Sequence, residues 1–221
     1  MSRYIIASVT DYFKDKIKKK NFYFINKKKK LNLKNIEKIN PKIIFFPHWN
    51  WKIKDSILNH YLCIGFHSTP LPYGRGGSPI QNMIVRGHKL STVCAIKLEN
   101  KLDGGPIYLK KNFKLGGRAE IIFEKIYKII FSMIVILIKK VPKPKMQLGK
   151  SYYFNRRKPE ESNIGTLNSL NKVYDYIRML DTNVKNFPLA FVSTSNLNIQ
   201  FKYAKKEKNF VIAKAIIRIK H

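Results

Sequence analysis

The chain has 221 residues, enough to bury a core in one large domain, and its hydrophobic content of 44% excludes a disordered protein. Lysine and arginine number 44 against 13 acidic residues, which gives a formal net charge of +31. Such a charge is compatible with a nucleic-acid or anionic-membrane surface, but the excess is mostly lysine and runs along the whole chain. We therefore interpret it as a bias of composition.

Strands and helices alternate along the first part of the chain. Strands are expected at residues 4–9, 22–25, 42–46, 63–66, 92–98 and 107–113, and helices at 12–19, 55–60, 79–86 and 119–140. The segment KIIFF at 42–46 is apolar throughout, which is typical of a strand covered on both faces of a parallel sheet. The pattern predicts an open, mainly parallel, Rossmann-like α/β sheet with helices on both faces.

The rest of the chain is expected to form a small α+β tail. A helix is predicted at 168–180, followed by antiparallel strands at 190–193, 197–203 and 210–219. We therefore expect an α/β domain over residues 1–145 and a C-terminal part over 146–221. The apolar segment 129–138 is shorter than the ~20 residues that span a bilayer, so no membrane span is expected.

The cysteines and the N-terminus indicate the compartment. Cys63 and Cys94 are far apart in sequence and fit no metal spacing, so we expect buried, reduced thiols and no metal site. The N-terminal sequence has no long apolar stretch or cleavage signal of a secreted protein. A cytoplasmic protein is predicted, with a homodimer left open.

One loop gathers the residues of a candidate site. The stretch FHSTPLPYGRGGSPIQN at 66–82 places His67 just after a predicted strand, in front of a loop rich in proline and glycine. Asp103, in KLDGGPIYL, follows the predicted strand 92–98. Because ligands bind beyond the carboxyl ends of parallel strands, we expect both side chains at one edge of the sheet and close together. Asp103 followed by two glycines is also a good turn, which is the structural alternative.

These residues resemble the folate-dependent formyltransferases, which include methionyl-tRNA, glycinamide ribonucleotide and sugar-nucleotide N-formyltransferases. The ordered matches over residues 40–140 are His67, Leu71-Pro72, Arg75-Gly76, Pro79-Ile80 and Leu102-Asp103-x-Gly105. The segments FHSTPLPYGRGGSPIQN, SYYFNRRKPEESNI and YDYIRMLD are most similar to the enzymes of surface-sugar modification. The resemblance implies a formyltransferase-type sheet and transfer of a formyl group from 10-formyltetrahydrofolate to a primary amine.

The resemblance also implies roles for residues. His67 stabilises the oxyanion that forms when the amine attacks, and Asp103 orients the imidazole and helps to take the amine proton. Arg75, Gly76 and Pro79 belong to the loop; Arg75 either holds it or contacts an anionic group of the substrate. His48, Trp49, Trp51 and Gly104 are expected to line the folate pocket, although aromatic residues at a strand end are as often simple packing.

One position departs from the family pattern. The asparagine found two residues before the histidine is replaced by Gly65, which has no side chain. Losing one such donor costs about 3 kcal/mol of transition-state stabilisation. Either another donor has replaced it, with Ser68, Thr69 and Asn82 as candidates, or the protein is an impaired, folate-binding relative.

The sequence leaves the identity of the acceptor amine open. Residues 146–221 are expected to be too short for the C-terminal barrel of methionyl-tRNA formyltransferases, which favours a small amine on a nucleotide-linked sugar over tRNA. A nucleic-acid-binding module is a further alternative on charge alone, without a recognisable RNA-binding signature.

Overall fold

The computed structural model describes residues 3–14, 16, 21–183 and 188–220. The chain divides into two compact units, each made from separate stretches of sequence. Unit 1 comprises residues 1–75, 92–112 and 126–153, and unit 2 comprises residues 76–91, 113–125 and 154–221. The expected boundary at residue 145 stays a prediction.

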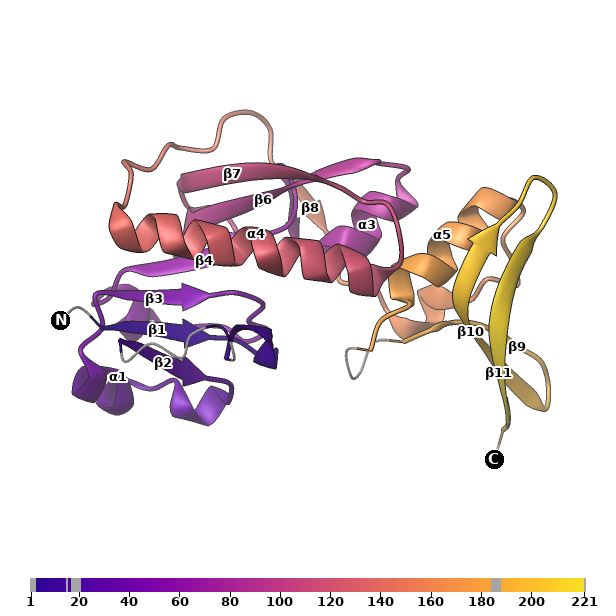
Figure 1. Ribbon diagram of the computed structural model, residues 1–221, viewed down its shortest axis with the longest axis horizontal. Coiled ribbons are helices and arrows are strands. Elements are labelled where there is room, and N and C mark those ends of the chain that lie inside the picture. The colour runs from indigo at the N-terminus through magenta and orange to yellow at the C-terminus, as the bar shows by residue number, and fades with distance from the viewer. Residues whose placement is uncertain (1–2, 15, 17–20, 184–187, 221) are drawn as a thin grey trace. The chain divides into compact units, whose positions relative to one another are not determined.

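A six-stranded sheet forms the centre of unit 1 (Figure 1). Its order is β2-β1-β3-β4-β6-β7. The strands are β1 (Tyr4–Ala7), β2 (Phe22–Ile25), β3 (Ile43–Phe46), β4 (Cys63–His67), β6 (Leu90–Lys97) and β7 (Ile107–Lys114). The first four in the order run parallel, whereas β6 runs antiparallel to β4. The predicted α/β sheet, mainly parallel, is confirmed.

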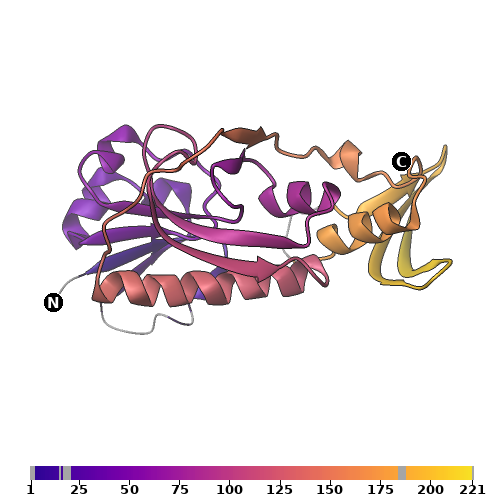
Figure 2. The same ribbon diagram turned by 90° about the horizontal axis from the view of Figure 1, so that it is seen from above.

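Helices cover both faces of this sheet (Figure 2). On one face, Ile36 of α1 (Leu33–Ile39) and Ile57 of α2 (Asp55–Leu58) are fully buried in one apolar cluster with β1, β3 and β4. On the other lies α4 (Ala119–Lys139), of which residues 126–139 belong to unit 1. The apolar side chains of α4 that recur at helical spacing are buried, as expected for a core helix.

Two thiols are buried in the same sheet. Cys63 lies on β4 and Cys94 on β6, and both are free. Burial raises the pKa of Cys63 to about 12 and also raises that of Cys94, since an apolar environment disfavours the thiolate. Both side chains therefore act as small apolar core residues.

Unit 2 contains α3 (Pro79–Val85), α5 (Leu170–Leu180) and a three-stranded antiparallel sheet. Its strands are β9 (Ala190–Ser193), β10 (Leu197–Lys206) and β11 (Val211–Ile219), with β10 in the middle. Helix α5 packs on β10, and Gln81 of α3 donates a hydrogen bond to the carbonyl of Met179.

A buried carboxylate ties the parts of unit 2 together. Asp181, just after α5, is 1% exposed and pairs with Arg118 (Nη1–Oδ2 3.3 Å) and Lys202 (Nζ–Oδ1 3.9 Å). It also accepts a hydrogen bond from the backbone N–H of Tyr203. Because a buried carboxylate needs such partners, this residue links β10 to the residue that precedes α4.

Several elements differ from the expectation. Helix α1, strand β5 (Tyr73–Gly76) and strand β8 (Tyr152–Phe154) were not predicted. The expected helix at 12–19 is a 3-10 helix over Asp11–Phe13 in its described part, and residues 15 and 17–19 lie outside the described residues. No helix within the described ranges is long and apolar enough to cross a membrane.

Candidate active site around His67

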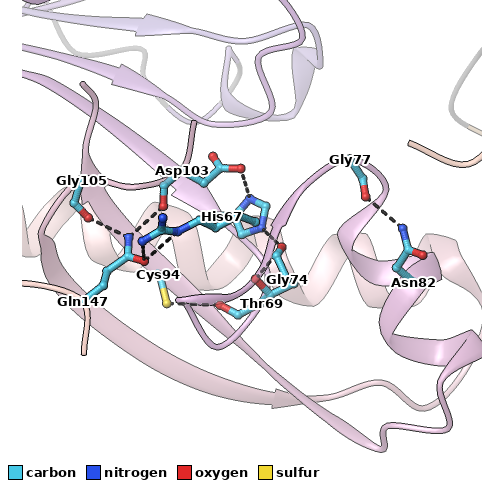
Figure 3. Close-up of polar contacts among 10 residues, drawn as sticks. His67, Thr69, Gly74, Gly77, Asn82, Cys94, Asp103, Gly105 and Gln147 are labelled. Carbon is cyan, nitrogen blue, oxygen red and sulfur yellow. Dashed lines mark hydrogen bonds and ion pairs between the residues drawn. The ribbon is translucent and has the colours of Figure 1, made fainter. Parts of the chain in front are cut away.

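His67 is the last residue of β4, opposite Cys94 of β6, and is 8% exposed. Its Nδ1 lies 3.5 Å from Oδ2 of Asp103, and its Nε2 lies 2.7 Å from the carbonyl oxygen of Gly74 (Figure 3). A carbonyl and a carboxylate can only accept hydrogen bonds. Both ring nitrogens of His67 therefore face hydrogen-bond acceptors.

Asp103 reaches His67 by a different route from the expected one. The carboxyl ends of β4 and β6 do not share an edge, because β6 is antiparallel and Lys97 lies opposite Ile64. The loop that follows β6 instead carries Asp103 to His67. Asp103 adopts a left-handed conformation (φ 47°), which aspartate tolerates better than most residues, within a turn closed by the N–H of Gly104 on the carbonyl of Lys101. The turn and the pairing with His67 thus occur together.

Gly105 fixes the end of this turn. A Cβ atom at this position would lie 1.8 Å from the backbone oxygen of Lys97. No side chain fits there without moving the main chain, which explains the second glycine of the LDGG sequence. Gly104, by comparison, would meet only the side chain of Lys101.

The loop after His67 is closed by its own hydrogen bonds. The hydroxyl of Thr69 donates to the carbonyl of Gly74 (3.1 Å), and the thiol of Cys94 donates to the carbonyl of Thr69 (3.3 Å). Gly76 has φ 101°, and a Cβ there would lie 2.4 Å from the oxygen of Phe154. Gly76 therefore meets both a conformational and a steric requirement.

Arg75 is 4% exposed and bonds to neutral groups. Its Nε and Nη2 donate to Oε1 of Gln147 (3.1 and 2.7 Å), and its Nη1 donates to the hydroxyl of Tyr153 (3.2 Å). No carboxylate pairs with it among the residues that the structure describes. Of the two expected roles, the contacts show how Arg75 holds the loop. Gln147 was not singled out from the sequence, since it belongs to no recognisable motif.

Leu98 fills the place that a side chain at position 65 would take. A Cβ on Gly65 would lie 2.5 Å from Cδ2 and 3.0 Å from Cγ of Leu98. Leu98 also packs against the apolar clusters on both sides of it. The substitution of the family asparagine by glycine is therefore matched by a leucine that occupies the space.

This contact leads to a prediction on stability. Gly65→Asn should lower the free energy of unfolding by about 1–3 kcal/mol, because the new side chain overpacks against Leu98. The double variant Gly65→Asn/Leu98→Ala should be more stable than the sum of the two single changes implies. Urea unfolding of the four proteins measures this coupling. Purely additive effects would show that Leu98 does not occupy the space of the missing side chain.

The three candidate replacement donors have different surroundings. The hydroxyl of Thr69 is bound to Gly74, and the amide of Asn82, in unit 2, donates to the carbonyls of Gly77 and Asn155 (3.0 Å each). Ser68 is half-buried directly after His67. Pro79, also in unit 2, begins α3 at a position where its missing N–H costs nothing.

The aromatic residues expected at the folate pocket lie after β3. His48 has φ 55°, and its Nδ1 lies 2.6 Å from the hydroxyl of Tyr127. Burial raises the pKa of Tyr127, so its hydroxyl stays protonated beside His48. Trp49 packs edge-on against Phe46 and Trp51.

The indole N–H of Trp49 is buried and has no hydrogen-bond partner in the part of the chain that the structure describes. Burying a donor without a partner is costly. A ligand oxygen or ring nitrogen would satisfy it, which fits a polar heterocycle bound beside this residue.

Comparison with known proteins identifies the family of the chain. A family model described as the C-terminal domain of methionyl-tRNA formyltransferase matches residues 159–218. A methionyl-tRNA formyltransferase of Thermodesulfovibrio yellowstonii is 29% identical over 154 residues, which are 66% of this chain and 50% of that protein. The chain spans about half or less of the length of the curated relatives it matches.

Solved structures match over more of the chain. The methionyl-tRNA formyltransferase from Clostridium thermocellum is 39% identical, covers 100% of both chains and has a TM-score of 0.92. A likely sugar N-formyltransferase from Mycobacterium tuberculosis, 12% identical over 88% of this chain and 93% of its own, has a TM-score of 0.69 and shows the fold alone. On the identity and complete coverage of the first of these structures, the chain belongs to the formyltransferase family.

Proposed function

We propose that this protein transfers a formyl group from 10-formyltetrahydrofolate to a primary amine. The observation that carries the proposal is the pairing of His67 with Asp103, 3.5 Å apart beside a closed loop, in a chain of the formyltransferase family. The alternative of an impaired, folate-binding relative rests on Gly65, and folate binding without turnover would identify it.

The donor supplies a formyl group whose oxygen gains negative charge as the amine attacks. The contacts of both ring nitrogens place the imidazole of His67 at the end of β4, where it stabilises such an oxygen. Asp103 holds the ring, and its side chain is 18% exposed, so it keeps access to the proton that the amine releases.

The residues present fit the folate. The unsatisfied indole N–H of Trp49 provides a donor for the heterocycle, and Trp51 supplies an aromatic ring next to it. His48 is held by the hydrogen bond between its Nδ1 and the hydroxyl of Tyr127. The free, buried thiols agree with a reaction in the reducing cytoplasm.

For the acceptor we propose the amine of a nucleotide-linked amino sugar, on the likeness of residues 66–82, 151–164 and 174–181 to the surface-sugar enzymes. Methionyl-tRNA is the second candidate. The length of the C-terminal part does not separate the two candidates, because residues 159–218 match the C-terminal domain of methionyl-tRNA formyltransferase. These residues contain α5 and a three-stranded sheet.

A comparison of turnover with each acceptor decides between the two. The purified protein is given 10-formyltetrahydrofolate with either a panel of nucleotide-linked amino sugars or charged initiator tRNA, and release of tetrahydrofolate is followed by absorbance. We expect turnover with an amino sugar. Efficient formylation of methionyl-tRNA, without activity on any amino sugar, would overturn the choice of acceptor.

The same preparations test whether the positive charge is a bias of composition. Binding to tRNA should then be weak at physiological salt, should show no preference for the initiator and should vanish as salt rises. Each neutralised phosphate adds about 0.7 to 0.9 to the slope of log affinity against log salt. Initiator-selective binding that persists at high salt would contradict this.

A further inference from the structure

Gln147 lies at the centre of the hydrogen bonds around Asp103, although the proposed formyl transfer assigns it no role. Its Nε2 donates to the backbone oxygens of Asp103 and Gly105, each at 2.8 Å. Its Oε1 accepts from Nε and Nη2 of Arg75. Figure 3 shows the amide between these two carbonyls, beside the turn that carries Asp103.

This network fixes the orientation of the amide. Both N–H bonds of the amide are used on carbonyls, and its oxygen is used twice by the guanidinium. Turning the amide over would point its oxygen at two carbonyls and its NH₂ group at a cation. Hydrogen bonds from the buried cation also polarise the amide and so strengthen the bonds that it donates.

The chain on either side of Gln147 is held as well. Two residues earlier, Lys145 exchanges both backbone hydrogen bonds with Ile107 at the start of β7 (2.7 and 2.9 Å). Five residues later, the N–H of Tyr152 donates to the carbonyl of Pro72 (3.2 Å), and the ring of Tyr152 stacks on Tyr73. The adjacent side chains, Met146 and Leu148, are 70% and 85% exposed. Gln147 is thus the inward-facing side chain of an anchored segment.

We propose that Gln147 is a positioning residue, which holds the Asp103 turn at the distance that His67 requires and couples it to Arg75 in the loop after His67. Asp103 has φ 47°, an uncommon conformation for a residue other than glycine, so the turn needs support from outside. The amide supplies that support on both sides of the residue, at positions 103 and 105. The kinetic part of this inference rests on the proposed function.

Two substitutions separate the hydrogen bonds that Gln147 donates from those that it accepts. Gln147→Met removes both the donated and the accepted hydrogen bonds, with little change in side-chain size. Gln147→Glu keeps an acceptor for Arg75 but loses both donors and places a carboxylate oxygen against two carbonyls. We expect each to lower kcat by about tenfold to a hundredfold, as a small displacement of a reacting group does, with KM changed by less than a few fold. Met146→Ala and Leu148→Ala serve as controls and should leave kcat unchanged.

A double-variant comparison shows whether Gln147 acts through Asp103. In an Asp103→Asn background, Gln147→Met should cause little further loss, since the group that it positions has already lost its charge. Full additivity of the two losses would overturn the inference, and so would turnover close to wild type in Gln147→Glu.

A readout without catalysis keeps this test separate from the proposed function. In protein labelled with ¹⁵N-histidine, the Nδ1 resonance of His67 should shift in both Gln147 variants and stay in place in Met146→Ala. An unchanged resonance in folded Gln147→Glu would overturn the positioning role. If wild type formylates no amine but the resonance moves as expected, the proposed function fails and the role of Gln147 stands.

Discussion

His67→Ala is expected to reduce formyl transfer by a factor of about 10²–10⁴, the range over which a positioned proton-transfer group contributes. The change removes the imidazole that faces Asp103 and the hydrogen bond between Nε2 and the carbonyl of Gly74. The fold should be retained, because the hydroxyl of Thr69 still holds the same carbonyl. Turnover on the acceptor amine, with circular dichroism to verify folding, measures the effect.

His60→Ala provides a matched control for this variant. His60 is exposed and bonds through Nδ1 to the carbonyl of Ser56, away from the loop after β4. Its replacement should leave turnover unchanged. Should His67→Ala keep most of the wild-type rate, the assignment of His67 would be wrong.

Asp103→Asn is the second change from which we expect a large loss of turnover. Asparagine tolerates φ 47° at least as well as aspartate, so the turn and its bonds to Gln147 should persist. Only the charge that faces Nδ1 of His67 is lost. We expect kcat to fall by about 10²–10⁴, with the affinity for folate changed little.

The control for this variant is Asp55→Asn, which removes an exposed carboxylate from the first turn of α2. Steady-state kinetics on both substrates, together with folate binding by fluorescence, separate kcat from affinity. If Asp103→Asn hardly changes kcat, Asp103 serves the turn alone and the amine proton leaves by another route.

The sequence was sufficient to predict most of the fold, because its signals are local. KIIFF predicts a strand buried on both faces, and β3 (Ile43–Phe46) is buried throughout. The predicted orientation of β6, parallel to β4, was wrong, because the sequence of an eight-residue strand does not indicate whether it pairs parallel or antiparallel to its neighbour. Helix α1 was not predicted because it is short and rich in lysine, and only Ile36 of its apolar face is fully buried.

The features of the candidate site also divide into those that the sequence indicates and those that only the structure shows. His67 and Asp103 could be singled out from the sequence because a motif contains them, and in the structure their side chains lie 3.5 Å apart. The contact of Leu98 with the space beside Gly65 and the bonds of Gln147 to Asp103 depend on packing between distant segments. Such contacts leave no periodic or compositional signal in a single sequence, so only the structure reveals them.

The two buried thiols provide a built-in measure of how often this sheet opens. Alkylating reagents attack the thiolate, and burial suppresses both ionisation and access at Cys63 and Cys94. Labelling of the native protein therefore proceeds only through transient opening of β4 and β6, and its rate reports the free energy of that opening. Because Cys94 lies opposite His67 in the strand pairing, its labelling rate follows the integrity of the backbone that carries the imidazole. Variants around the site can thus be compared for local opening in the native protein through its own cysteines, without an identified substrate.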